Sequence, residues 1–132
     1  MANELPPNRE QGEVHFLKLM AEELRKAEYP PGSTFRRESM LYVFKKFRIA
    51  YGPMYSDRYL KSKIKQLFKK YREFSVLMSE DEIYWDKQNN IVYGNDKLLR
   101  EKYKARYRAG AYLGEENYDL MCEIFESGVK FE

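Results

Sequence analysis

The chain has 132 residues, of which 43% are hydrophobic and 34% charged, and its formal net charge is +3. This composition argues against disorder and is typical of one globular domain with enough apolar material for a core. Cys122 is the only cysteine, so no disulfide can form within one chain and a reducing compartment is expected. We find no secretory signal and no apolar run long enough to span a bilayer, so no membrane partner is expected.

Charge is distributed unevenly along the chain. Basic residues are dense between Arg36 and Arg72, whereas acidic residues prevail in the N-terminal part and at the C-terminal end. A segregated basic stripe is typical of a protein that binds a polyanion. A solvated helix face would look the same, but two adjacent basic helices favour the polyanion.

Two helices are predicted in the first part of the chain, after a loose polar arm over residues 1–11. The first spans Gly12–Lys26, and the second spans Phe35–Ile49, after the helix-ending Pro30-Pro31-Gly32 and a cap at Ser33 or Thr34. Their expected buried faces are Phe16, Leu17, Met20 and Leu24 in the first helix, and Met40, Val43, Phe44 and Phe47 in the second. The exposed face of the second helix carries Arg36, Arg37, Lys45, Lys46 and Arg48.

The third predicted helix, over residues 56–78, is the longest. Apolar residues recur at steps of three and four and share one face: Leu60, Ile64, Leu67, Tyr71, Phe74 and Met78. The opposite side carries Arg58, Ser62, Lys65, Gln66 and Lys69, with Lys61 and Arg72 beside them. Ser56 suits the N-cap, and Asp57 suits the positive end of the helix dipole.

The rest of the chain predicts a small β-hairpin and two short helices. Residues 83–86 and 91–93 form the hairpin arms around a turn at Asn89-Asn90. Asn95 or Asp96 would cap a helix that buries Leu98 and Leu99, residues 104–114 are partly irregular, and a last helix covers residues 116–126. The predicted fold is thus mostly α: a three-helix helix-turn-helix core (12–78) with an integral C-terminal extension (79–128) in one domain, followed by a tail (129–132).

The order of these elements and their motifs resemble a known family. The pieces that carry the likeness are Phe16-Leu17-x-Leu19, Thr34-Phe35-Arg36-Arg37-Glu38, Phe47, Tyr51-Gly52, Tyr55-Ser56, Leu60-Lys61-Ser62-Lys63-Ile64-Lys65-x-Leu67, Tyr71, Trp85-Asp86, Val92, Asp96 and Asn117-Tyr118-Asp119-Leu120-x-Cys122-Glu123-Ile124-Phe125. Together they resemble the Myb/SANT-like domain of plant proteins and of the Myb-like partners of Harbinger-type transposons. The likeness runs from about His15 to Gly128.

The chain departs from the family at its aromatic positions. Myb-type repeats carry an aromatic core residue, usually Trp, in each of three helices. Here the first position falls near Arg9 or is absent, and Met40 and Ile64 stand at the others. Leu99 stands where the fourth helix often has Trp. Ser62 replaces a frequent Asn, and since Ser bonds to several bases it discriminates less among them than Asn does.

The resemblance implies a nuclear, DNA-binding or chromatin-associated adaptor domain whose third helix lies in the major groove. In this interpretation duplex DNA is the partner, and the residues that face its major groove are Lys61, Ser62, Lys65 and Lys69. Phosphate contacts would come from Arg58, Arg72, Arg36 and Arg37, with Lys45 and Lys46 next.

The alternative is a protein-interaction module, because SANT-type domains also bind histone tails or other proteins. A chromatin or transposase-like protein would be the partner. Tyr103, Tyr107 and Tyr112 lie among basic residues and are candidate interface anchors. The same tyrosines could instead pack back on the domain.

An enzyme is not expected. His15 is the only histidine, Cys122 lies in an apolar helix, and the chain has neither a Gly-rich phosphate loop nor metal-ligand spacing. We therefore expect no catalytic residues, no cofactor, no metal and no small-molecule substrate.

Overall fold

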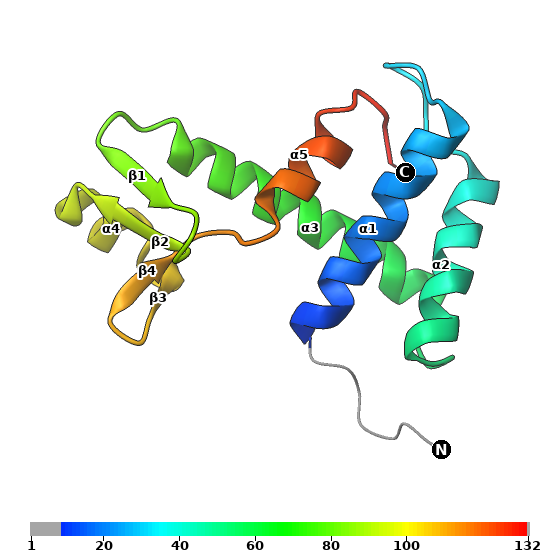
Figure 1. The fold of residues 1–132 in the computed structure, drawn as a ribbon, viewed down its shortest axis with the longest axis horizontal. Helices are drawn as coiled ribbons and strands as arrows, with labels where there is room; N and C mark the ends of the chain where they lie inside the picture. The colour runs from blue at the N-terminus through cyan, green and yellow to red at the C-terminus, as the bar shows by residue number, and fades with distance from the viewer. Residues whose placement is uncertain (1–8, 132) are drawn as a thin grey trace. The chain divides into compact units, whose positions relative to one another are not determined.

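The computed structural model describes residues 9–131. The arm predicted over residues 1–11 therefore lies largely outside the described residues. The described chain is mostly helical with one small sheet (Figure 1), as predicted. Its elements are α1 (Arg9–Ala27), α2 (Arg37–Tyr51), α3 (Asp57–Met78), β1 (Ile83–Asp86), β2 (Ile91–Gly94), α4 (Asp96–Lys102), the 3-10 turn η1 (Lys104–Arg106), β3 (Tyr107–Arg108), β4 (Ala111–Leu113) and α5 (Tyr118–Phe125).

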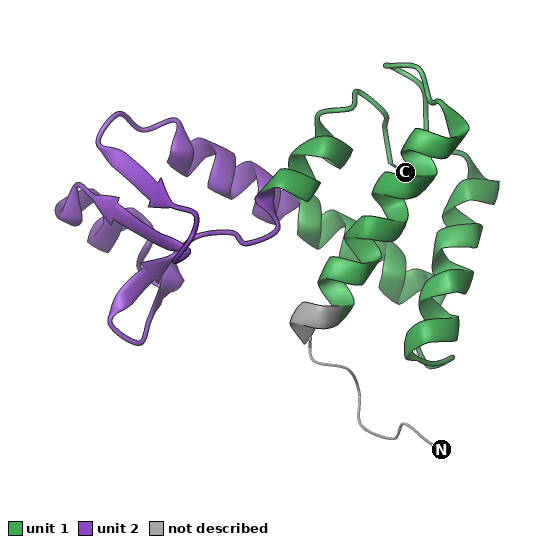
Figure 2. Cartoon of the chain, in the orientation of Figure 1, with its two compact units in different colours: residues 1–68, 119–132 green, residues 69–118 purple. Residues whose placement is uncertain are grey.

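These elements form two compact units, coloured separately in Figure 2. The first contains the described residues up to Phe68 together with those from Asp119 onward. The second contains Lys69–Tyr118. Helix α3 contributes its N-terminal part to the first unit and its C-terminal part to the second.

The first unit is built on helices whose apolar faces match the predicted ones. Helices α1 and α2 lie side by side and run in opposite directions (Figure 1). All eight residues predicted to face the core from the first two helices are buried, as are Leu60, Ile64 and Leu67 of α3. The aromatic rings interlock: Phe16 stacks on Phe44 and meets the edge of Phe47. Helical spacing alone therefore located this core.

The start of α2 differs from the prediction of a Ser33 or Thr34 cap. The helix begins at Arg37, and Arg36 at the N-cap makes no side-chain capping bond. The Ser33 hydroxyl instead donates to the carbonyl of Pro30, 2.6 Å away. The Arg36 N–H donates to the Tyr29 hydroxyl, 2.8 Å away. A tyrosine from the preceding loop thus takes the place of a local capping residue.

The C-terminal segment completes the first unit. Residues 128–130 pair with 32–35 through three backbone hydrogen bonds, from Gly32 N–H to Gly128 O, from Phe35 N–H to Lys130 O and from Lys130 N–H to Ser33 O. Val129 is buried, and the ring of Phe131 packs against Phe35. Together with buried Met121 and Ile124 of α5, this segment adds apolar side chains to the core formed by α1, α2 and α3.

The second unit contains an antiparallel sheet in the order β1-β2-β4-β3. The predicted hairpin is present as β1 and β2, and Asn90 in its turn has the expected positive φ of 55°. Asn95 caps α4 as predicted, accepting from the Leu98 N–H at 3.1 Å. The second hairpin, β3 and β4, was not predicted, because its strands are only two and three residues long.

One aromatic cluster holds the second unit together. Its buried centre consists of Phe74, Leu77, Ile83, Val92 and Leu99. Trp85 packs edge-on to Phe74 and donates its indole N–H to Asn90 Oδ1 at 3.0 Å. Asn90 in turn donates to the carbonyl of Gly114. A side chain at Gly114 would meet the Trp85 indole nitrogen at 2.1 Å, which explains why glycine stands there.

Candidate nucleic-acid interface

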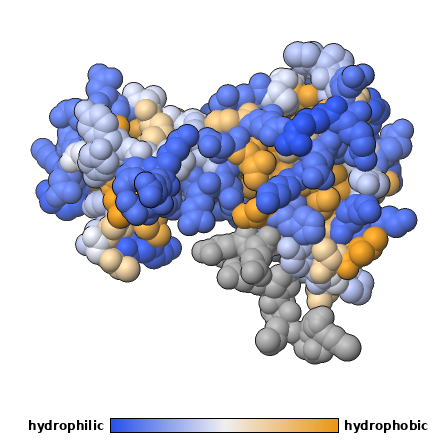
Figure 3. All heavy atoms as spheres, viewed as in Figure 1, coloured by the Kyte–Doolittle hydropathy of each residue, from blue (hydrophilic) through white to orange (hydrophobic). Residues whose placement is uncertain are grey.

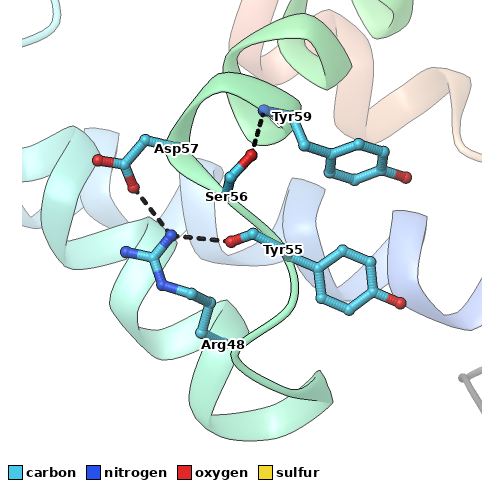
Figure 4. A network of polar contacts seen from close by, with 5 residues as sticks. All are labelled: Arg48, Tyr55, Ser56, Asp57 and Tyr59. Atoms are coloured by element: carbon cyan, nitrogen blue, oxygen red, sulfur yellow. Dashed lines mark hydrogen bonds and ion pairs between the residues drawn. The ribbon is translucent and has the colours of Figure 1, made fainter.

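The turn that leads from α2 into α3 is held by Arg48 (Figure 4). Its Nη1 donates to the carbonyl of Tyr55 at 3.0 Å and to Asp57 Oδ1 at 2.8 Å. The Ser56 hydroxyl accepts from the Tyr59 N–H at 3.1 Å, which is the predicted N-cap. Arg48 thus fixes the first turn of α3 rather than standing on an exposed basic face, and the sequence alone did not reveal this role.

Basic residues outnumber acidic ones on α3, and two of them form ion pairs within the described chain. Lys63 pairs with Glu13 of α1 at 3.2 Å, and both side chains are largely buried, with exposed fractions of 15% and 8%. Within the second unit, Lys70 pairs with Glu115 at 3.6 Å. Each lysine follows a buried leucine, Leu60 or Leu67, by three positions, so each lies beside the apolar face. That spacing was a usable signal for their structural role.

The remaining basic residues of α3 face solvent. Arg58, Lys61, Ser62 and Lys65 are exposed on the part of the helix that belongs to the first unit. Among the described residues no acidic side chain forms an ion pair with Arg58, Lys61 or Lys65. Phosphate groups could therefore bind them without breaking an internal salt bridge. Lys69 and Arg72 are exposed on the part of α3 in the second unit.

Arg36 and Arg37 lie at the other end of α2 from this surface. Helix α2 has 15 residues and is therefore about 22 Å long, and the turn into α3 follows its C-terminal end. Both arginines are exposed, and the Arg36 guanidinium stacks on the Tyr29 ring at 4.4 Å. They would have to reach phosphates remote from those near Lys61. Lys45 and Lys46 are exposed further along α2.

The three candidate tyrosines have different environments in the second unit. Tyr103 and Tyr112 are partly buried and pack against the aromatic cluster. Burial raises the pKa of the Tyr103 phenol, and nearby Glu80 raises it further, while Arg106 opposes both effects. Only Tyr107 is largely exposed, at 49%, with its ring edge-on to Tyr112 at 4.9 Å. The structure thus gives Tyr107 and Tyr112 a common surface and Tyr103 a packing role.

The positions where the family usually has tryptophan lie in the two cores. Met40 and Ile64 are buried in the first unit, and Leu99 is buried in the second. Each is apolar and smaller than Trp, and each is at most 6% exposed. Ser62 is exposed on α3, so its hydroxyl is available to an external partner.

Groups that could support other activities are engaged or scattered. His15 Nδ1 lies 3.1 Å from the Tyr51 hydroxyl. Within residues 9–131, no three His, Cys, Asp or Glu side chains gather in a way that could hold a metal ion. No helix in that range is both long enough and apolar enough to cross a bilayer.

Comparison with models of protein families shows which family the chain belongs to. The model of the Myb/SANT-like DNA-binding domain matches residues 9–103, most of the chain. The chain belongs to the Myb/SANT-like DNA-binding domain family. The match runs from α1 to the end of α4 and so includes both the helical trio and the first hairpin. Comparisons with curated proteins and with solved structures find no match.

Membership gives this Myb/SANT-like chain a general DNA-binding role, in a family of binding domains rather than enzymes. It also agrees with the order of elements: three helices, of which the second and third are joined by a short glycine-containing turn. On the face drawn in Figure 3, hydrophilic side chains predominate between smaller apolar patches.

Proposed function

We propose that the chain binds duplex DNA through the exposed face of α3 and contacts mainly phosphates. The observation that carries the proposal is the sorting of charge on this helix. Lys63 and Lys70 are held in ion pairs, whereas Arg58, Lys61 and Lys65 are directed to solvent with no ion pair among the described residues. Neutralising a phosphate releases condensed counterions, so such cations bind DNA without reading its sequence.

Each unit offers further candidate phosphate contacts. In the second unit these are Lys69 and Arg72, and in the first unit Arg36 and Arg37 would bind phosphates at a second position along the duplex. Ser62 can bond to more than one base and so confers little discrimination. We therefore infer weak sequence preference, and we place the protein in the nucleus, as a targeting or adaptor component that acts on chromatin.

Single substitutions test this proposal. Lys65→Ala should weaken binding to a duplex of random sequence by about tenfold at low salt, because one phosphate contact is lost. Lys97→Ala removes the same charge from exposed α4, which lies outside the proposed surface, and should change affinity by less than about twofold. Fluorescence anisotropy of labelled duplex measures both. Equal effects of the two variants would show that net charge, and not α3, determines binding.

A protein-interaction role is a second candidate. Tyr107 is exposed beside Tyr112 at a groove in the second unit, and exposed tyrosines favour interfaces. This role is compatible with DNA binding by α3, because it uses other residues. A Tyr107→Ala variant that still binds DNA but fails to bind a protein partner would separate the two roles.

A further inference from the structure

A groove in the second unit offers a surface that differs from the basic face of α3. It has a volume of about 990 Å³ and is lined by β2, α4, η1, β3, β4 and the turn at Gly110, all within that unit. The side chains that matter for its chemistry are Leu99, Arg100, Lys104, Tyr107 and Tyr112.

The groove lies beside the end of a short sheet ladder. Strands β2 and β4 pair at Ile91 with Leu113 and at Val92 with Tyr112. The next residues in register, Tyr93 and Ala111, are not part of the recorded pairing, and both line the groove. An extended segment of another chain could therefore lie along the groove beside the end of this ladder.

A supported aromatic ring stands along the groove. Tyr107 is 49% exposed and lies edge-on to Tyr112, with ring centroids 4.9 Å apart. Tyr112 in turn packs against the buried cluster of the second unit. A partner side chain would therefore meet a ring that its neighbour already supports. Buried Leu99 and Val92 give the groove an apolar base.

The charge around the groove is positive. Among the residues that line the groove, Arg100 and Lys104 are basic and Asp96 is acidic. At the groove itself, the Asp96 carboxylate pairs with Arg100 at 3.0 Å. Lys104 is exposed, and within residues 9–131 no acidic group forms an ion pair with it. A lysine-rich tail would meet like charge here, whereas carboxylates would be attracted.

We propose that this groove docks an acidic, extended peptide segment of a partner protein. Carboxylates of the segment bind at Arg100 and Lys104, and an apolar or aromatic side chain packs on the exposed ring of Tyr107. The proposal rests on the protein-interaction role and is independent of DNA binding by α3. A single-stranded nucleic acid fits less well, because it needs a continuous cationic track and several open ring faces, whereas Tyr112 here is partly buried against the cluster.

The test selects a displayed library of random peptides on the full chain and measures the enriched peptides by fluorescence anisotropy. We expect enriched peptides to combine Asp or Glu with aromatic or aliphatic residues. Lys104→Glu and Tyr107→Ala should each weaken their binding by about tenfold. Lys102→Glu makes the same charge change on exposed α4 outside the groove and should cost less than about twofold.

Three outcomes would overturn the proposal: enriched peptides without acidic character, equal losses in Lys104→Glu and Lys102→Glu, or binding of oligothymidylate that is lost in Lys104→Glu. Duplex binding of each variant is measured in parallel. Retained duplex binding with no acidic-peptide binding rejects the groove proposal alone. The reverse result rejects the role of α3 alone.

Discussion

At the scale of single residues, the neighbouring basic positions of α3 have different environments. Lys63 is largely buried against Glu13, whereas Lys65, two positions further, is exposed. The amino-acid type is the same, and the position relative to the apolar face decides whether the lysine forms an internal ion pair or faces solvent. Arg48, which spans the turn to Tyr55 and Asp57, is another basic residue assigned to structure.

This difference predicts that Lys63→Ala lowers stability, whereas Lys65→Ala weakens DNA binding. Lys63→Ala removes the ammonium group that pairs with the buried Glu13 carboxylate and should lower the free energy of unfolding by about 2–3 kcal/mol. Lys65→Ala should change it by less than about 0.5 kcal/mol while weakening DNA binding. Urea unfolding followed by circular dichroism measures the stabilities. If both variants were equally stable, the assignment of Lys63 to structure would be wrong.

At the scale of elements, helical periodicity predicted the helices and their buried faces well, whereas the short strands β3 and β4 were missed. Phe16, Met40 and Ile64 were placed in the core because steps of three and four define a face. The hairpin of β3 and β4 escaped prediction because two paired residues leave no alternation to detect. The hydrogen bond from the Arg36 N–H to the Tyr29 hydroxyl was also not predicted, because no local capping rule includes a tyrosine seven residues earlier.

The same limit applies to the candidate interface. The exposed face of α3 follows from periodicity, so Lys61 and Lys65 could be placed on it. The groove beside Tyr107 could not, because it depends on where the ladder between β2 and β4 ends. The separation of Arg36 and Arg37 from Lys61 follows only once the direction of α2 is known.

One contact between elements should make stability depend on pH. In the first unit, Arg25 of α1 binds Glu123 of α5, with Nη2 to Oε1 at 3.1 Å. The hydrogen bond and charge of Arg25 lower the pKa of Glu123 below its ordinary value. A lowered carboxyl pKa contributes stability that is present above the unfolded pKa and lost as the pH falls through the folded one.

Glu123→Gln should therefore lower the melting temperature at neutral pH and reduce its decline in acid. Glu116→Gln, at an exposed position with no ion pair among the described residues, should leave the profile unchanged. Thermal unfolding at a series of pH values below neutrality gives both curves. Parallel curves for Glu123→Gln and the unmodified chain would contradict a role for this contact.

At the scale of the whole molecule, the C-terminal part adds buried apolar side chains and backbone hydrogen bonds to helices α1, α2 and α3. Met121, Ile124 and Val129 are buried in the first unit, and residues 128–130 pair with the loop before α2. The family match, which ends at residue 103, does not reach these residues. We therefore propose that the extension is integral to the fold.

A chain of residues 1–80 tests this proposal. It lacks α5 and the segment after it, so apolar surface of α1, α2 and α3 becomes exposed to water. We expect a molten or insoluble product without a cooperative thermal transition. A sharp unfolding transition in 1–80, detected by circular dichroism, would show that the trio is stable alone.

The central claim is that exposed lysines of α3 bind DNA phosphates, and a salt titration tests it most directly. Binding to random duplex should weaken with salt with a log–log slope of roughly −4 to −5, if about five phosphates are neutralised. The variant with Lys61, Lys65 and Lys69 all changed to Ala should bind far more weakly and with a slope about three units shallower. A salt response that is flat, or the same in both proteins, would contradict the account.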